Sequence, residues 1–148
     1  MNQVQHILED AQRRLAVLRL DASIQEIAGI LANPVTPLVV VCDSDGVALG
    51  VVSSADIVTA LSRDSGEAVN ANAAALMSQP IRSCAPDQTL QSIWATMGAG
   101  CVRCIPVLDE AGKPLGIVHA RDVARALLDE VTYEEVLLRD YVLDIGYQ

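Results

Sequence analysis

The feature that most constrains the fold of this 148-residue chain is an internal repeat. The segments 38–61 (LVVVCDSDGVALGVVSSADIVTAL) and 104–127 (CIPVLDEAGKPLGIVHARDVARAL) align without a gap at a constant offset of 66 residues. Each copy carries an Asp before a turn Gly, then a second Gly followed by two β-branched residues, and a later Asp. A repeated supersecondary unit cannot bury its apolar face alone and stacks on its copy. The sequence therefore predicts two related units with a cleft between them.

The offset extends upstream, where Asp21 pairs with Asp87 and Ser23 with Thr89. In each copy the apolar spacing alternates between strand and helix periods, which predicts the order strand, helix, strand, strand, helix. The elements expected in the first copy lie over 15–20, 23–33, 38–41, 48–52 and 53–61. Those expected in the second copy lie over 81–84, 89–97, 105–108, 115–118 and 121–128.

Helical segments are also expected outside the copies. Apolar residues from Val4 to Leu15 recur at helical spacing, which predicts an N-terminal amphipathic helix. The polar stretch 62–73 is expected to connect the copies before a short helix that ends near Met77. Thr132 and Glu135 have the spacing of a capping box, so a terminal helix is expected to begin there.

Composition and charge narrow the class of protein. Hydrophobic residues make up 51% of the chain but aromatic residues only 3%, which predicts a core of aliphatic side chains. The net charge of −9 repels phosphate backbones and argues against nucleic acids and anionic membranes as partners. A bound phosphate would therefore need a local cationic pocket. No apolar run is long enough to span a bilayer and the N-terminus lacks signal-peptide features, so we expect a cytoplasmic protein.

Ser53 and Asp56 stand three residues apart where a strand is expected to become a helix. Backbone N–H groups and the positive end of the helix dipole converge at such a point and favour an anion. The Ser hydroxyl could bind a phosphate, and the Asp carboxylate, an acceptor, suits a ribose diol. Ser followed by Asp in the first turn is also ordinary helix capping. From these residues alone both interpretations stay open.

The order and spacing of these motifs resemble a tandem pair of CBS domains (cystathionine β-synthase domains, also called a Bateman module). The resemblance covers about residues 4–144 and rests on GVVSSAD at 50–56, MSQPI at 77–81 and IPVLD at 105–109. It implies an α/β (α+β) fold in which two β-α-β-β-α repeats pack pseudo-symmetrically between flanking helices. The repeats would span residues 1–66, with the N-terminal helix, and 67–148, with the C-terminal helix.

The resemblance further implies a non-catalytic sensor that binds AMP, ADP, ATP, NAD or S-adenosylmethionine between the repeats. In the family, Asp holds the ribose, the Ser or Thr three residues earlier meets phosphate, and the opposite repeat's first strand flanks the adenine. Carried over, Asp56 would hold the ribose, Ser53 a phosphate, and Arg103 would pair with phosphate. The adenine walls would be Ile81, Arg82, Ser83 and Cys84.

The second half departs from the family pattern. Asp122 is present, but His119 stands where the family has Ser or Thr. A neutral His can still donate one hydrogen bond, and a charged one could pair with phosphate. Arg121 precedes Asp122, as is common in the family, and either contacts phosphate or lies in solvent. The adenine walls of this doubtful site would be Val17, Leu18 and Leu20.

Two alternatives compete with the sensor hypothesis. Cys101-Val-Arg-Cys104 has the spacing of a thiol redox or metal-binding site, but the repeat pairs these cysteines with Val35 and Leu38. An apolar role is the simpler interpretation, and no second such motif completes a zinc site. The other alternative is a structural interaction module with an empty cleft. No nucleophile or acid–base arrangement stands out, so we expect no enzyme, no metal and no required cofactor. A homodimer and an unidentified effector protein are the expected partners.

Overall fold

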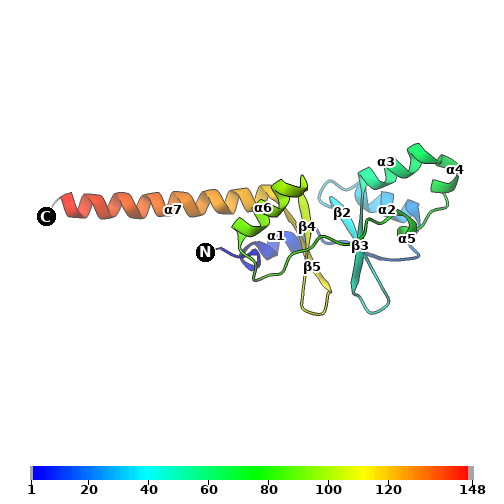
Figure 1. Ribbon diagram of the computed structural model, residues 1–148, viewed down its shortest axis with the longest axis horizontal. Coiled ribbons are helices and arrows are strands. Elements are labelled where there is room, and N and C mark those ends of the chain that lie inside the picture. Colours follow the sequence, from blue (N-terminus) through cyan, green and yellow to red (C-terminus); the bar gives the residue numbers. More distant parts are fainter. Residues whose placement is uncertain (1, 147–148) are drawn as a thin grey trace.

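Two small β-sheets, one from each copy of the repeat, lie side by side at the centre of the molecule (Figure 1). The computed structural model describes residues 2–146, so residues 1 and 147–148 of the expected repeats lie outside the described range. Helices pack around the sheets, which confirms the expected α+β fold.

The first unit holds β1 (Val17–Arg19), α2 (Ile24–Leu31), β2 (Leu38–Cys42), β3 (Ala48–Ser53) and α3 (Ser54–Arg63). The second unit holds α6 (Leu90–Gly100), β4 (Cys104–Leu108), β5 (Pro114–His119) and α7 (Ala120–Gly146). Short helices complete the chain: η1 (Val4–Ile7), α1 (Leu8–Arg13), α4 (Ser65–Ala68) and α5 (Ala73–Leu76). The expected connector over 62–73 thus contains a helical turn, α4.

The two hairpins turn in the same way. Gly46 and Gly112 have φ values of +84° and +82°, a conformation that side chains disfavour. Before each glycine, the carboxylate of Asp43 or Asp109 accepts two backbone N–H bonds of 2.9 to 3.0 Å from the turn. The Asp and Gly of the repeated motif therefore fix the β2–β3 and β4–β5 registers.

The strand expected over 81–84 is wrong: this segment makes a single parallel bridge to β4, at Cys84. In the first unit the Val40 N–H donates to the Ala16 carbonyl at 2.9 Å, which holds β1 on β2. The position 66 residues after Val40 is Pro106, which has no N–H to donate. The ladder that builds a third strand in the first sheet therefore lacks a bond in the second.

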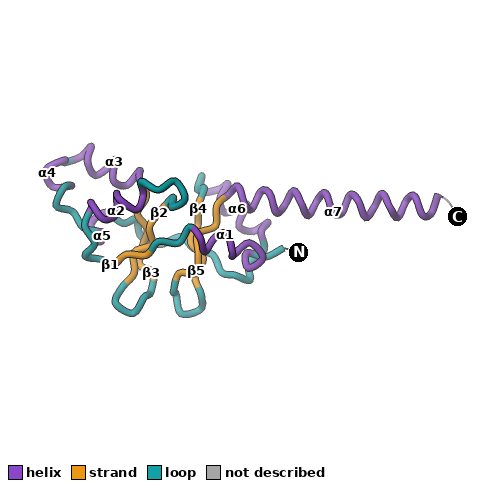
Figure 2. Tube along the Cα trace, turned by 180° about the vertical axis from the view of Figure 1, so that it is seen from behind, coloured by secondary structure: helices purple, strands orange, loops and turns teal. Residues whose placement is uncertain are grey.

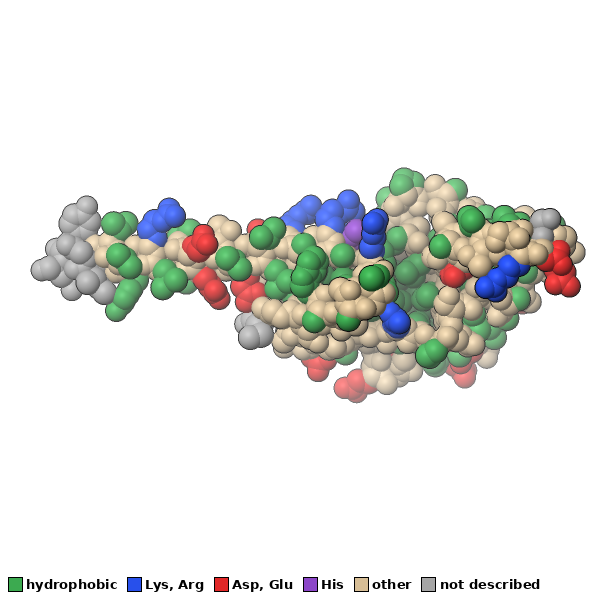
Figure 3. All heavy atoms as spheres, turned by 45° about the horizontal axis from the view of Figure 1, so that its top comes forward, with side chains coloured by type: hydrophobic (Ala, Val, Ile, Leu, Met, Phe, Trp, Pro, Cys, Tyr) green, Lys and Arg blue, Asp and Glu red, His purple; other side chains and the backbone are tan. Residues whose placement is uncertain are grey.

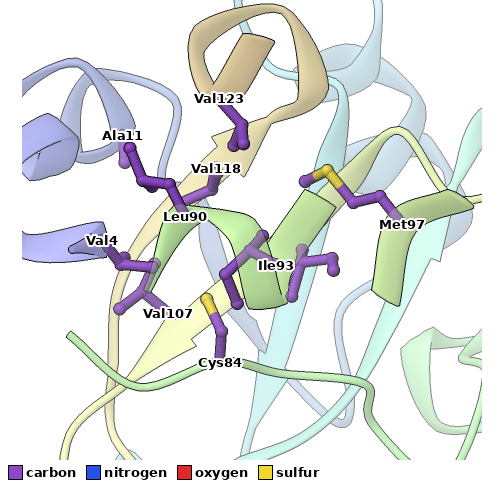
Figure 4. Close-up of a cluster of buried hydrophobic side chains, with 10 residues drawn as sticks. Val4, Ala11, Cys84, Leu90, Ile93, Met97, Val107, Val118 and Val123 are labelled. Atoms are coloured by element: carbon purple, nitrogen blue, oxygen red, sulfur yellow. The ribbon is translucent and has the colours of Figure 1, made fainter. Parts of the chain in front are cut away.

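Each unit takes up a segment that precedes its own first strand. η1 and α1 place Val4 and Ala11 in the second unit's core beside Leu90 and Ile93 (Figure 4). In the same way α5 packs into the core of the first unit. The N-terminal helix, which was expected with the first repeat, therefore packs against the second.

Two glycines let these segments approach the sheets. A Cβ at Gly116 would lie 2.8 Å from the backbone of Ala11, and a Cβ at Gly50 would lie 2.7 Å from the Ser78 carbonyl. Both pairs are related by approximate repeat symmetry. Because no side chain fits at either glycine, α1 rests directly on β5 and the segment after α5 rests directly on β3.

A single continuous helix, α7, stands where two helices were expected, the second beginning at Thr132. No Gly or Pro occurs between residues 120 and 145, so nothing in the sequence stops the first helix before the second begins. Figure 2 shows α7 extending far beyond the two sheets. Within residues 2–146, no helix is both long and apolar enough to cross a membrane.

Candidate functional site

A cavity of about 870 Å³ lies between the two units. Its walls come from the ends of β2, β3, β4 and β5, from the start of α3 and from the segment after α5. It is lined by Pro37, Leu38, Val51, Ser53, Ala55, Asp56, Ser78, Gln79, Pro80, Arg82, Val102, Arg103, Cys104, Pro106 and His119. Apolar side chains therefore form most of the surface, and a few polar groups converge on it, as is typical of small-molecule sites.

Ser53 and Asp56 meet at the start of α3, on the wall of this cavity. The Ser53 N–H donates to Asp56 Oδ2 at 2.8 Å, and the Asp56 N–H donates to Ser53 Oγ at 3.4 Å. The capping interpretation is therefore correct. Ser78 donates its hydroxyl to the other oxygen, Oδ1, at 3.1 Å. Each carboxylate oxygen keeps a further lone pair, so the cap does not prevent Asp56 from accepting a bond from a ligand hydroxyl.

Arg82 and Arg103 bring positive charge to the cavity from the second unit's side. Both side chains are exposed, and in the described part of the chain neither has a carboxylate at ion-pair distance. The guanidinium of Arg82 lies over Gly100, where any side chain would collide with it. Two cations thus face a cavity that also holds a carboxylate, in a chain whose net charge is −9.

Three of the expected adenine walls lie away from the cavity. Cys84 is 4% exposed and packs in the second unit's core, where burial raises its thiol pKa to about 12. Ile81 packs against the cluster between the sheets, and Ser83 is exposed. Of the segment 81–84, only Arg82 lines the cavity.

Sequence reasoning missed much of the lining, including Leu38, Ser78 and Cys104. The repeat itself carried a signal for part of it. Ser53 and His119 are 66 residues apart, as are Pro37 and Arg103, and all four line the cavity. Applying the repeat offset to each expected residue would have found its counterpart, because the cavity is built from equivalent strand ends.

In the second half, Asp122 is withdrawn into the protein. It is 9% exposed and forms an ion pair with Arg14, whose side chain is 14% exposed. Arg14 also donates to the Ile117 carbonyl at 3.3 Å, which holds the guanidinium against β5. The carboxylate equivalent to Asp56 therefore already has a cationic partner from the end of α1.

His119 and Arg121 lie beside this ion pair at the junction of β5 and α7. The Arg121 N–H donates to His119 Nδ1 at 3.0 Å, so a neutral ring carries its proton on Nε2. Burial, followed by the nearby charges of Arg121 and Arg14, lowers the pKa of His119. Figure 3 shows Lys and Arg side chains gathered around a histidine on one face of the molecule.

The adenine walls expected for this half lie elsewhere. Val17 and Leu18 line a separate hollow of about 410 Å³, which His119, Arg121 and Asp122 do not line. Leu20 packs against the core of the first unit. The structure therefore does not bring the residues of the doubtful site together.

The two cysteines of the CxxC motif differ in their surroundings. Cys101 is exposed and ends α6 with a φ of +52°, whereas Cys104 is half-buried at the start of β4. Burial is the main cause that raises the pKa of Cys104, which favours the protonated thiol. Among residues 2–146, no three His, Cys, Asp or Glu side chains come together as a metal site.

Comparison with known proteins gives one curated relative and many solved structures. An uncharacterized 17.7 kDa protein from Acidianus ambivalens is 29% identical over 125 residues, which is 84% of this chain and 74% of the relative. The crystal structure of the CBS-domain containing protein ATU1752 from Agrobacterium tumefaciens is 30% identical, with a TM-score of 0.73. The match covers 84% of this chain and 92% of that one.

Two further structures share the fold and were solved with ligands. The CBS domain pair of protein MJ0100, in complex with 5-methylthioadenosine and S-adenosyl-L-methionine, is 20% identical with a TM-score of 0.73, over 88% of this chain and 98% of that one. CBSX2 in complex with AMP is 21% identical with a TM-score of 0.73, over 87% and 98% of the two chains. The CBS domain model itself matches residues 4–63 and 73–129, so the chain belongs to the CBS-domain family as a tandem pair.

Proposed function

We propose that this protein is a non-catalytic regulatory module that binds an adenosine-containing ligand in the 870 Å³ cavity. The observation that supports this function is the Ser53–Asp56 pair, which opens onto a cavity that also presents two unpaired guanidinium groups. MJ0100 and CBSX2 were solved with adenosine compounds, which supports the same class of ligand.

In this proposal Asp56 accepts hydrogen bonds from the ribose hydroxyls, beside the bond it already accepts from Ser78. The phosphate lies at the start of α3, where Ser53, the helix dipole and Arg103 favour negative charge. Because Asp122 is paired with Arg14, we propose one strong site per chain rather than two.

Isothermal titration with AMP, ADP, ATP, NAD and S-adenosylmethionine tests the function. At least one compound should bind with a stoichiometry near one per chain. Asp56→Ala should weaken that binding at least about tenfold, because it removes charge-assisted hydrogen bonds. Asp45→Ala, which removes an exposed carboxylate from a hairpin turn, is the matched control and should bind like the wild type.

Two outcomes would count against the proposal. If none of the five compounds binds, the alternative of a structural module with an empty cleft gains support. If Asp56→Ala and Asp45→Ala bind equally well, the ligand does not use the Ser53–Asp56 pair.

The protein is also proposed to form a homodimer that passes the ligand signal to an effector protein. The support lies in α7, whose outer part exposes nine large apolar side chains between Leu128 and Leu143. An isolated helix is marginal in water, so packing against a partner would stabilise this segment.

A further inference from the structure

A second, smaller cavity adjoins the first. It measures about 330 Å³ and is lined by Arg14, Pro34, Val35, Pro37, His119 and Arg121. Pro37 and His119 line both cavities, so a ligand in the larger one can extend past them into the smaller one. No carboxylate is among the lining residues of the smaller cavity.

The smaller cavity is unsuited to a nucleoside. Asp122, the carboxylate that would hold a second ribose, is buried against Arg14. The close contact of Ala11 with Gly116 holds α1, and with it Arg14, in this position. The hollow that is left presents donors and no acceptor side chain for sugar hydroxyls.

Its charge favours an anion instead. Asp122 balances Arg14, but within residues 2–146 no carboxylate lies at ion-pair distance from Arg121. His119 accepts from the Arg121 backbone through Nδ1, which leaves its Nε2–H as a donor. One uncompensated guanidinium and one imidazole N–H thus face a hollow in a chain with a net charge of −9.

Resting on the proposed function, we propose that the ligand is an adenosine nucleotide with two or more phosphates, whose terminal phosphate lies in the smaller cavity. The nucleoside and first phosphate lie at Asp56 and Ser53 in the larger cavity. The chain of phosphates passes His119, and the terminal phosphate pairs with Arg121. The smaller cavity is thus the subsite that distinguishes ADP and ATP from AMP.

Titrations of AMP, ADP and ATP into the wild type, Arg121→Gln and Arg125→Gln, at one fixed ionic strength, test this subsite. Arg125 lies one turn further along α7, is exposed and lines neither cavity, so its substitution removes the same charge away from the subsite. The wild type and Arg125→Gln should bind ADP or ATP at least about tenfold more tightly than AMP. Arg121→Gln should lose that preference and keep its affinity for AMP.

Equal affinity of the wild type for all three nucleotides would overturn the subsite while leaving the proposed function intact. The subsite would also be overturned if Arg121→Gln weakened the three nucleotides equally, or if Arg125→Gln lost the preference to the same extent. If the wild type bound none of the three, the subsite and adenine nucleotide binding would fail together.

Discussion

At the scale of single residues, the two repeats differ most in the partner of one carboxylate. Asp56 accepts a hydroxyl bond from Ser78 and faces a cavity, whereas Asp122 is buried against Arg14. A hydroxyl leaves a carboxylate charged and able to accept further bonds. A buried guanidinium compensates the charge, and the pair is stable only while both partners are present.

Arg14→Gln should therefore destabilise the fold by about 3–5 kcal/mol, because it leaves the Asp122 carboxylate buried without a cation. Arg13→Gln is the matched control, since Arg13 makes only exposed ion pairs, which contribute about 0–1 kcal/mol. Urea denaturation measures both free energies of unfolding. A similar loss in the two variants would show that the buried pair contributes little.

At the scale of elements, two glycines decide how closely each unit holds its extra segment. α1 lies on β5 at Gly116, and the segment after α5 lies on β3 at Gly50. These contacts position Arg14 beside Asp122 and Ser78 beside Asp56. The same backbone arrangement therefore closes one half and leaves the other open, because the residues delivered differ.

Gly116→Ala should force α1 away from β5, because its Cβ would lie 2.8 Å from the Ala11 backbone. Overpacking of this kind costs about 1–3 kcal/mol of stability. Gly29→Ala, in α2 with open space around it, should be neutral or stabilising because Ala favours the helix. Thermal denaturation compares the two melting temperatures, and an unchanged melting temperature for Gly116→Ala would refute the close contact.

At the scale of the whole molecule, α7 is the element with the fewest partners. Its first turns pack on the second unit, and its outer part extends beyond the body (Figures 1 and 2). Leu138 and Tyr141 are each 64% exposed there. Burial of such side chains in a second copy would stabilise an extended helix that has no other support.

The whole protein should therefore sediment as a dimer, and Leu138→Glu should shift it towards the monomer by placing a charge in the contact. Thr59→Glu adds the same charge to an exposed position on α3 and should leave the dimer intact. Analytical ultracentrifugation over a range of concentrations measures both. A Leu138→Glu protein that stays as dimeric as Thr59→Glu would show that α7 is not the interface.

By itself, the sequence determined the two hairpins, the helix caps and the relation between the units. These depend on local chemistry: Gly46 and Gly112 supply a positive φ, and Ser53 caps the helix that follows it. The repeat offset carries each local feature from one unit to the other. The positions of Ser53 and Asp56 at the start of α3 follow from the same local rules, and so does their capping box.

Only the tertiary structure decided which residues meet across the units. Arg14 and Asp122 are more than a hundred residues apart in the chain, and no spacing rule links a helix end to a buried carboxylate at that separation. Likewise Cys84 lies in the core rather than in the cavity, because its segment makes one bridge to β4 instead of forming a strand. Long-range packing chooses among local possibilities that are otherwise equivalent, and here it made the two halves of a repeated sequence unequal.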